Sequence, residues 1–356
     1  MPYCWKCGSK LEEEAKYCHV CGASVGEPSA RSTSPPSNLR RRTWSPVYTL
    51  AVVLVGILVV GTVVSVFVFL PVQQVSFTRS EQVLAESGVR AVNLNMTADV
   101  SGFNVTFADL NGRVMAMNVT ATGGVGAFAP SDPLNVTVNH LRSGHTMQVD
   151  ARIERNGVWW PVFGGLNVVC DVQVERSLNV TLKIKTGVGR VVLLASSGVV
   201  LDSLNLETAT GGAEASLGQG VIVNGNVTVQ STTGGANLNW DNVKVTDDVS
   251  IAVKTTTGGV GVDIVEDSSM NRNVTLNAET VTGGVDFSMM IQDGVGAVVN
   301  SSTIVGGVNT NLTRFSGVAS SLRSENYPAA SNFVVTLKTT TGGINVDAAY
   351  GPGTHM

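Results

Sequence analysis

Four cysteines stand in two pairs at the start of the chain. The pairs read Cys4-Trp5-Lys6-Cys7 and Cys18-His19-Val20-Cys21, with ten residues between them. Each pair can present two thiolates from one tight turn, and two such turns complete a tetrahedral four-thiolate site. A segment of about 20 residues cannot bury a sufficient core, so a metal would supply its folding free energy. The spacing predicts a structural Zn²⁺ ion held by Cys4, Cys7, Cys18 and Cys21, with a redox dithiol pair as the rival interpretation.

Each cysteine pair is followed directly by a glycine, Gly8 or Gly22, where a knuckle turn often needs positive φ. With Tyr17 before the second pair, these residues resemble the short zinc-ribbon module of many archaeal and bacterial membrane proteins. The resemblance covers about residues 2–25, and we assign residues 1–25 to this domain. Some zinc ribbons bind nucleic acid, but here three lysines are offset by three glutamates. We therefore expect a structural cap or a module that docks a cytoplasmic protein.

An uncharged segment follows a Pro-, Ser- and Arg-rich linker over residues 26–46. Residues 47–70 contain no charged side chain, and at 1.5 Å per residue such a helix spans a hydrocarbon core of about 30 Å. Three arginines, Arg40 to Arg42, precede it, which places the N-terminus in the cytoplasm. We expect a single-pass cell-membrane protein whose helix contacts lipid as an anchor and whose C-terminal domain is extracytoplasmic.

The remainder of the chain has the composition of a β-protein. Of 356 residues, charged residues make up 14% and aromatic residues 6%, while glycine occurs 39 times. This composition favours strands joined by tight turns. Residues 72–356 carry sixteen Lys and Arg against twenty-three Asp and Glu. A mildly acidic body argues against nucleic-acid binding, which needs a basic surface.

A Thr-Gly-Gly signature recurs along the second half. Its glycine pairs begin at Gly211, Gly234, Gly258, Gly283, Gly306 (after Val305) and Gly342, at steps of 23, 24, 25, 23 and 36 residues. Such a period indicates one supersecondary unit per repeat, stacked on its neighbours. Apolar residues alternate on both sides, as in Val249, Ile251 and Val253 before one glycine pair. Val253 and Val260 flank the pair at an odd separation of seven, so the chain must turn there to keep both in one core.

Two folds satisfy this parity. We expect a mainly β protein with a parallel β-solenoid-like domain over residues 89–349, in which Gly-Gly is a corner and the preceding threonines form a ladder. The alternative is an antiparallel meander or sandwich, in which Gly-Gly is a hairpin loop. Residues 71–88 form a connector, with a helical turn around residues 80–86, and residues 350–356 form a tail.

The repeat pattern resembles the "putative adhesin" domain family of bacterial and archaeal cell envelopes. The resemblance rests on strand pairs such as residues 204–212 and 334–343, and it covers roughly residues 89–349. The family is β-solenoid-like and of largely unknown function. It implies surface attachment, and it brings no catalytic or binding residues with it.

Asn-x-Ser/Thr sequons are frequent beyond the predicted span, where an organism that N-glycosylates its surface proteins, such as an archaeon, could modify them. They begin at Asn95, Asn104, Asn118, Asn135, Asn179, Asn226, Asn273, Asn300 and Asn311. The rival interpretation is that Asn is a turn residue followed by strand formers. The fifth cysteine, Cys170, is expected to be a small buried hydrophobe.

The sequence contains no recognised catalytic motif, and we expect no enzyme. Glu266 and Asp267 are expected to be turn carboxylates. The favoured function is adhesion, envelope structure or recognition of a surface glycan or protein. One alternative is a transmembrane sensor that signals through the zinc ribbon to a cytoplasmic partner. Another is a carbohydrate-active β-helix enzyme, which would need a facing carboxylate pair.

Overall fold

The computed structural model describes residues 3–4, 6–12, 15–24, 46–68, 73–125, 132–156, 165–267, 270, 272–292 and 294–351. The predicted linker over residues 26–46 falls outside these ranges except for its last residue, as does most of the predicted tail. The chain divides into two compact units, Met1–Val64 and Ser65–Met356.

Helix α1 spans Pro46–Val68 and has neither an acidic residue in its first turn nor a basic residue in its last. Over the described residues, no helix combines the length and hydropathy that crossing a membrane requires. The predicted transmembrane helix over residues 47–70 is therefore not supported by the described structure.

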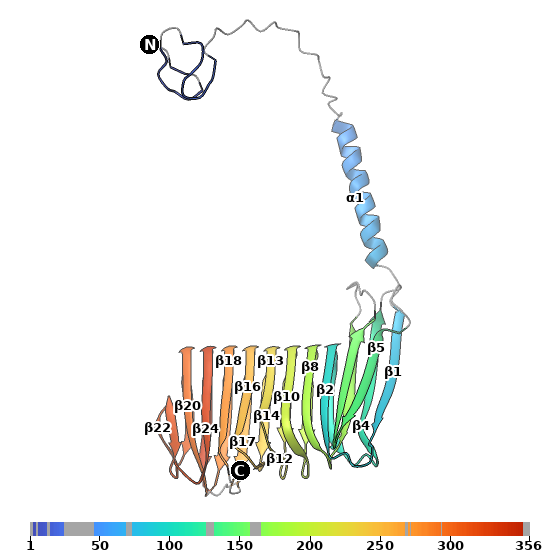
Figure 1. Ribbon diagram of the computed structural model, residues 1–356, viewed down its shortest axis with the longest axis vertical. Helices are drawn as coiled ribbons and strands as arrows, with labels where there is room; N and C mark the ends of the chain where they lie inside the picture. The colour runs from blue at the N-terminus through green and yellow to red at the C-terminus, as the bar shows by residue number, and fades with distance from the viewer. Residues whose placement is uncertain are drawn as a thin grey trace. The chain divides into compact units, whose positions relative to one another are not determined.

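The second unit consists of β-strands arranged in two large sheets (Figure 1). Sheet I has eleven strands in the order β1-β4-β7-β3-β9-β11-β14-β17-β19-β25-β21. Sheet II has fourteen, with the main order β22-β23-β20-β24-β18-β16-β13-β10-β8-β2-β6-β5 and the short β12 and β15 beside it. The strands are β1 (Gln73–Leu84), β2 (Ala91–Val100), β3 (Gly102–Ala108), β4 (Arg113–Val125), β5 (Leu134–Ser143), β6 (Thr146–Arg155), β7 (Leu166–Glu175), β8 (Asn179–Val188), β9 (Val191–Ala195), β10 (Val200–Thr210), β11 (Ala213–Leu217), β12 (Ile222–Val223), β13 (Val227–Thr233), β14 (Ala236–Asp241), β15 (Lys244–Val245), β16 (Val249–Thr257), β17 (Val260–Glu266), β18 (Val274–Thr282), β19 (Val285–Ile291), β20 (Val295–Val305), β21 (Val308–Thr313), β22 (Phe315–Val318), β23 (Ser321–Ser324), β24 (Ser331–Thr341) and β25 (Ile344–Tyr350).

Both sheets are mixed. The strands in the middle of each sheet pair in parallel, as β10 does with β8 and β13. Antiparallel pairs stand at the ends, where β1 pairs with β4, β5 with β6, and β20 with β23. The prediction of a mainly β domain is confirmed. The predicted connector over residues 71–88 instead contains the long strand β1, because pairing with β4 over its whole length outweighs the weak local preferences of its polar residues.

The glycine pairs are corners that join the two sheets. The strand before Gly258 is β16 of sheet II, and the strand after Gly259 is β17 of sheet I. Each pairs with strands from neighbouring repeats rather than with the other. The hairpin interpretation of Gly-Gly is therefore wrong. We call one strand of sheet II, its corner and the next strand of sheet I a rung.

The two glycines of a corner differ in backbone conformation and in surroundings. Gly258 has φ 141°, and a Cβ there would overlap the carbonyl oxygen of Gly234 in the adjacent rung. Its N–H donates to the carbonyl of Thr282 at 2.9 Å. A Cβ on Gly259 would lie 3.8 Å from the nearest atom, the carbonyl oxygen of Gly284. The first glycine is thus required by close approach, whereas the second has room for a methyl group.

A ladder of buried hydroxyls runs along the corners. The Thr255 side chain donates to the carbonyl oxygen of Gly234 at 2.8 Å. Equivalent bonds run from Thr208 to Gly189, Ser231 to Gly211, Thr280 to Gly258, Thr339 to Gly283 and Thr303 to Gly342. The threonine directly before each glycine pair, which the sequence favoured for the ladder, is exposed. The bonded hydroxyl stands two residues earlier because that position faces the core.

The order of rungs in space differs from their order in the chain. The rung β24–β25 lies between β18–β19 and β20–β21, so the 36-residue step carries the chain out through β22 and β23 and back (Figure 1). At the other end, β2–β3 lies between β8–β9 and β6–β7. The Gly342 repeat is last in the sequence but not in the stack.

Replacing Gly258 by alanine is predicted to destabilise the β-unit by about 2 to 4 kcal/mol, because the new Cβ meets a backbone carbonyl in a left-handed conformation. Gly259→Ala is the matched control, and its free energy of unfolding is expected to change by about 1 kcal/mol or less. Urea denaturation of the full chain, followed by circular dichroism, measures both. Equal losses in the two variants would contradict the assignment of the first glycine as the close-packed one.

Candidate functional site

The four predicted zinc ligands converge at one point. The sulfur atoms of Cys4, Cys7, Cys18 and Cys21 all lie within 4.8 Å of one another. The Cys4 and Cys21 sulfurs are 3.6 Å apart, as are those of Cys7 and Cys18. A tetrahedral zinc ion with Zn–S bonds of about 2.3 Å separates its sulfurs by about 3.8 Å. The residues therefore fit a four-coordinate zinc ion with little movement.

The two cysteine turns have the same backbone structure. The Gly8 N–H donates to the Cys4 carbonyl at 2.9 Å, and the Gly22 N–H donates to the Cys18 carbonyl at 2.8 Å. Both glycines have positive φ, 72° and 69°, as their position after each pair predicts. A short antiparallel bridge accompanies each turn and pairs Tyr3 with Lys10 and Tyr17 with Ser24. Each turn thus directs two sulfurs to the shared centre.

The surroundings of the sulfurs favour thiolate at two positions. The Ser9 hydroxyl lies 3.1 Å from the Cys7 sulfur and 3.2 Å from the Cys18 sulfur. Its hydrogen bond is the main reason that the pKa of Cys18 is lowered to about 5, and it also lowers the pKa of Cys7. Thiolate is the form that binds metal. The apolar core here consists of Cys4, Leu11 and Cys18 with Cys21 and Ala23 against them, so the ligands themselves make up most of it.

Cys170, the fifth cysteine, belongs to strand β7 of the second unit. Its side chain is fully buried, and burial raises the pKa of the thiol well above its usual range. A buried neutral thiol is neither a metal ligand nor a nucleophile. The prediction of a small buried hydrophobe is confirmed.

The sequons occupy two kinds of position. Those at Asn95, Asn104, Asn118, Asn135, Asn300 and Asn311 lie within strands, and those at Asn179, Asn226 and Asn273 lie at or just before strand starts. All nine side chains are exposed or half-buried. Some of these asparagine side chains form hydrogen bonds within the protein: Asn95 donates to Asp150 and Asn104 donates to Asp171, each at 2.9 Å. Glycosylation at these sites stays a prediction.

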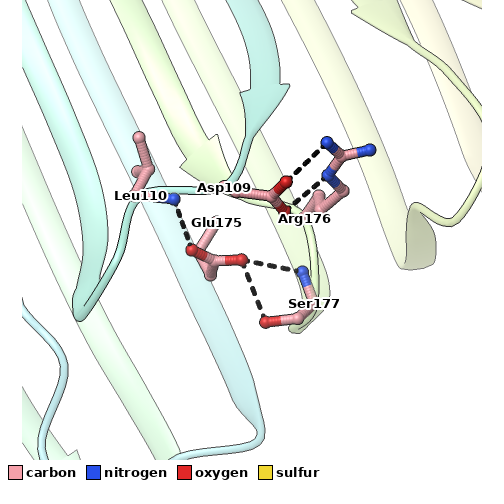
Figure 2. Close-up of polar contacts among 5 residues, drawn as sticks. All are labelled: Asp109, Leu110, Glu175, Arg176 and Ser177. Carbon is pink, nitrogen blue, oxygen red and sulfur yellow. Dashed lines mark hydrogen bonds and ion pairs between the residues drawn. The ribbon is translucent and has the colours of Figure 1, made fainter.

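Two polar arrangements had no signal in the sequence. Arg176 forms a bidentate pair with Asp109, with both distances 2.7 Å, across 67 residues of sequence (Figure 2). Beside it, Glu175 accepts from the Leu110 N–H at 2.7 Å and from the N–H and hydroxyl of Ser177. Together they fasten the turn after β3 to the turn between β7 and β8, and we assign them a structural role.

The second polar arrangement without a signal in the sequence is the contact between Glu266 and Trp240. The sequence placed it at a turn, but its side chain is 1% exposed. Trp240 Nε1 donates to its carboxylate at 3.3 Å, and this bond satisfies the indole N–H of a buried aromatic side chain. The turn assignment of Glu266 is therefore wrong, because the carboxylate closes the core at the end of β17.

Comparison with known families identifies the first unit's metal-binding segment. Residues 3–25 match the zinc-ribbon domain family. The N-terminus is a zinc-ribbon domain. No curated protein matches the sequence.

Several solved structures are similar to the β-unit. A putative cell adhesion protein from Clostridium sporogenes is 14% identical, with a TM-score of 0.36, over 78% of this chain and 100% of its own. A putative adhesin from Bacteroides fragilis is 10% identical, with a TM-score of 0.32, over 76% of this chain and 97% of its own. A putative lipid binding protein from Parabacteroides distasonis is 10% identical, with a TM-score of 0.30, over 77% and 96%.

The zinc ribbon is predicted to lose its metal when one ligand is removed. The purified chain should contain about one zinc ion, and Cys18→Ser should lower that content severalfold because three thiolates do not close the site. Cys170→Ala is the control and should retain the metal. Elemental analysis by mass spectrometry measures both.

Chelation gives an independent readout. A thiol-reactive reagent should not modify the four ribbon cysteines while zinc is bound. After a chelator removes the zinc, all four should react, whereas the buried Cys170 should react only once denaturant unfolds the β-unit. The affinity of the ribbon for zinc should fall as the pH decreases, because protonated thiols do not bind the metal. Four thiols that react without chelation would instead support the redox dithiol interpretation.

Proposed function

We propose that this chain is a membrane-anchored cell-surface protein whose β-unit acts outside the cell in adhesion, envelope structure or recognition, without catalysis. The observation that carries the proposal is the continuity of the β-unit. One apolar cluster extends from Val83 to Tyr350 between the two sheets. Charged and amide side chains are directed outward along both sheets. A stacked scaffold of this kind offers long, regular outer faces for binding.

The parallel section of the β-unit is proposed to be a β-solenoid with two strands per coil. The corners at Gly211, Gly234, Gly258 and Gly283 support this proposal, since each advances the chain by one strand in both sheets. The antiparallel strands at the two ends would then serve as caps, which stacked repeat proteins need to protect their ends.

The proposed location rests on the sequence and not on the described helix. Residues 47–70 lack charge and follow three arginines, which favours a cytoplasmic zinc ribbon and an extracytoplasmic β-unit. Thiolates for zinc are also best preserved in the reducing cytoplasm. An archaeal source with N-glycosylated sequons belongs to the same proposal.

A partner for the zinc ribbon is supported by its exposed aromatic side chains. Tyr3 and Tyr17 stand one residue before each cysteine pair, and each is 66% exposed. Val20, on the second turn, is 64% exposed. Aromatic groups at equivalent positions of two turns suit a docking surface for a cytoplasmic protein, so a sensor that signals through the ribbon is the second candidate.

Protease added to intact cells is predicted to cut the β-unit but not an epitope tag on residues 1–25, because only the former would lie outside. Deleting residues 47–70 should release the β-unit from the membrane fraction. Protection of both parts in intact cells would overturn the proposed location.

Deleting residues 1–25 separates the two candidate functions. If cells that carry the deletion still attach to a surface as before, that result would count against signalling through the ribbon.

A further inference from the structure

A shallow groove runs across the outer face of sheet I. It has a volume of about 610 Å³ and crosses β14, β17, β19, β25 and β21. Its walls are two rows of outward side chains in register, Asn237-Gly261-Asp286-Asn345-Asn309 and Asn239-Asp263-Ser288-Asp347-Asn311. The rows stand two residues apart on each strand, or about 7 Å, and repeat every 4.8 Å or so along the stack. The groove thus follows the stack and crosses the strands.

Hydrogen bonds fix the orientation of the side chains in both rows. Asn309 donates to Asn345 at 3.1 Å, and Asn345 donates to Asp286 at 2.7 Å. In the other row, Asn311 donates to Asp347 at 3.3 Å. Each of these amides uses one N–H in the row, and each carboxylate uses one oxygen. The second N–H groups and second oxygens are left to face a ligand.

Strand β17 contributes an unpartnered acceptor to the groove. Asp263 has no hydrogen-bond or ion-pair partner within the described residues, and its side chain is exposed. Also in β17, Gly261 has no side chain, and the side-chain oxygen of Asn237 covers it, since a Cβ there would lie 2.6 Å from that oxygen. The Asp263 carboxylate and the Asn237 amide oxygen, on neighbouring strands, thus offer acceptors for the hydroxyl groups of a ligand.

The lining groups select the chemistry of the occupant. They include three aspartates and no lysine or arginine, which disfavours phosphate, uronic acid and other anionic ligands. The apolar residues at the floor, Val262, Phe287 and Val346, are 2 to 3% exposed, so there are no pockets for peptide side chains. Within the described residues, the group with ligand atoms close enough to hold a metal ion is the four ribbon cysteines, and the groove aspartates do not form such a group. Amide donors and carboxylate acceptors within the same rows match the hydroxyl groups and ring oxygens of a neutral sugar.

We propose that this groove binds a neutral glycan chain that runs along the stack, with Asp263, Asp286 and Asp347 accepting hydrogen bonds from sugar hydroxyls and the amides donating to sugar oxygens. The proposal rests on the surface function above and names its ligand class and its site. The regular spacing of the rows would let successive sugar units meet polar side chains at a constant interval. Asn311 is also a sequon, so the glycan of the protein itself would compete for the groove if attached there.

The test uses the full chain from a host without N-glycosylation. Titration calorimetry measures binding of neutral tetrasaccharides of glucose, mannose and N-acetylglucosamine, with a galacturonic acid tetrasaccharide and an oligolysine peptide as competitors of other classes. At least one neutral tetrasaccharide should bind, and the uronic acid should not. Asp263→Ala should weaken binding about tenfold through loss of an unpartnered acceptor. Ser288→Arg, at an exposed position in the middle of the second row, should abolish it by filling the groove.

Asp247→Asn is the matched control, because it removes an exposed carboxylate of sheet II's loops and should leave affinity unchanged. Circular dichroism of each variant separates a blocked groove from a lost fold. Absence of binding to every neutral tetrasaccharide, unchanged binding by Ser288→Arg, or binding of oligolysine alone would each overturn the proposal. If cells still attach to surfaces through this chain while the groove binds no glycan, the surface function stands and this site assignment falls.

Discussion

The structure depends on how closely one glycine corner approaches the next. At each corner the first glycine lies so near a carbonyl oxygen of the adjacent rung that a Cβ would overlap it, and this holds for Gly189, Gly211, Gly234, Gly258, Gly283, Gly306 and Gly342. The same carbonyl also accepts a buried hydroxyl from the next rung, as Gly234 does from Thr255. Van der Waals contact and a hydrogen bond thus act on one oxygen. Because a one-residue slip would break both and turn apolar side chains outward, the corners fix the register of both sheets.

The ends of the stack are held by chain that returns from a distance. At one end β24 inserts between β18 and β20, and at the other β2 inserts between β8 and β6. A rung held between two others cannot peel away singly, so β24–β25 and β2–β3 are each tied to the body by pairing on both sides. Such pairing brings together residues far apart in sequence, as in the pairing of Val274 with Phe333, and it makes formation of the ends slow relative to local contacts.

The sequence predicted those features that depend on spacing. Two cysteine pairs define four ligands because each turn closes locally, and an odd separation across Gly258 requires a corner because side chains alternate in strands. Features that depend on which strands lie side by side in the folded protein could not be predicted from the sequence. The pairing of β1 with β4, the Asp109–Arg176 pair and the burial of Glu266 arise from neighbours that the repeat does not specify. The ladder position shifted from Thr257 to Thr255 for a local reason, since only the latter faces the core.

The two outer faces follow from this constraint and differ in chemistry. Corner and core positions are committed to packing, so only outward residues are free to vary with function. On sheet II, register places opposite charges on neighbouring strands, and Lys254 lies 3.2 Å from Glu279. On sheet I the corresponding rows hold amides and aspartates with no basic residue among the groove's lining. On sheet II the opposite charges satisfy each other, whereas Asp263 on sheet I keeps its acceptors for water or for a donor group of a ligand. The scaffold is common to both faces, and the composition of its outward rows is the reason that the proposed glycan site lies on sheet I.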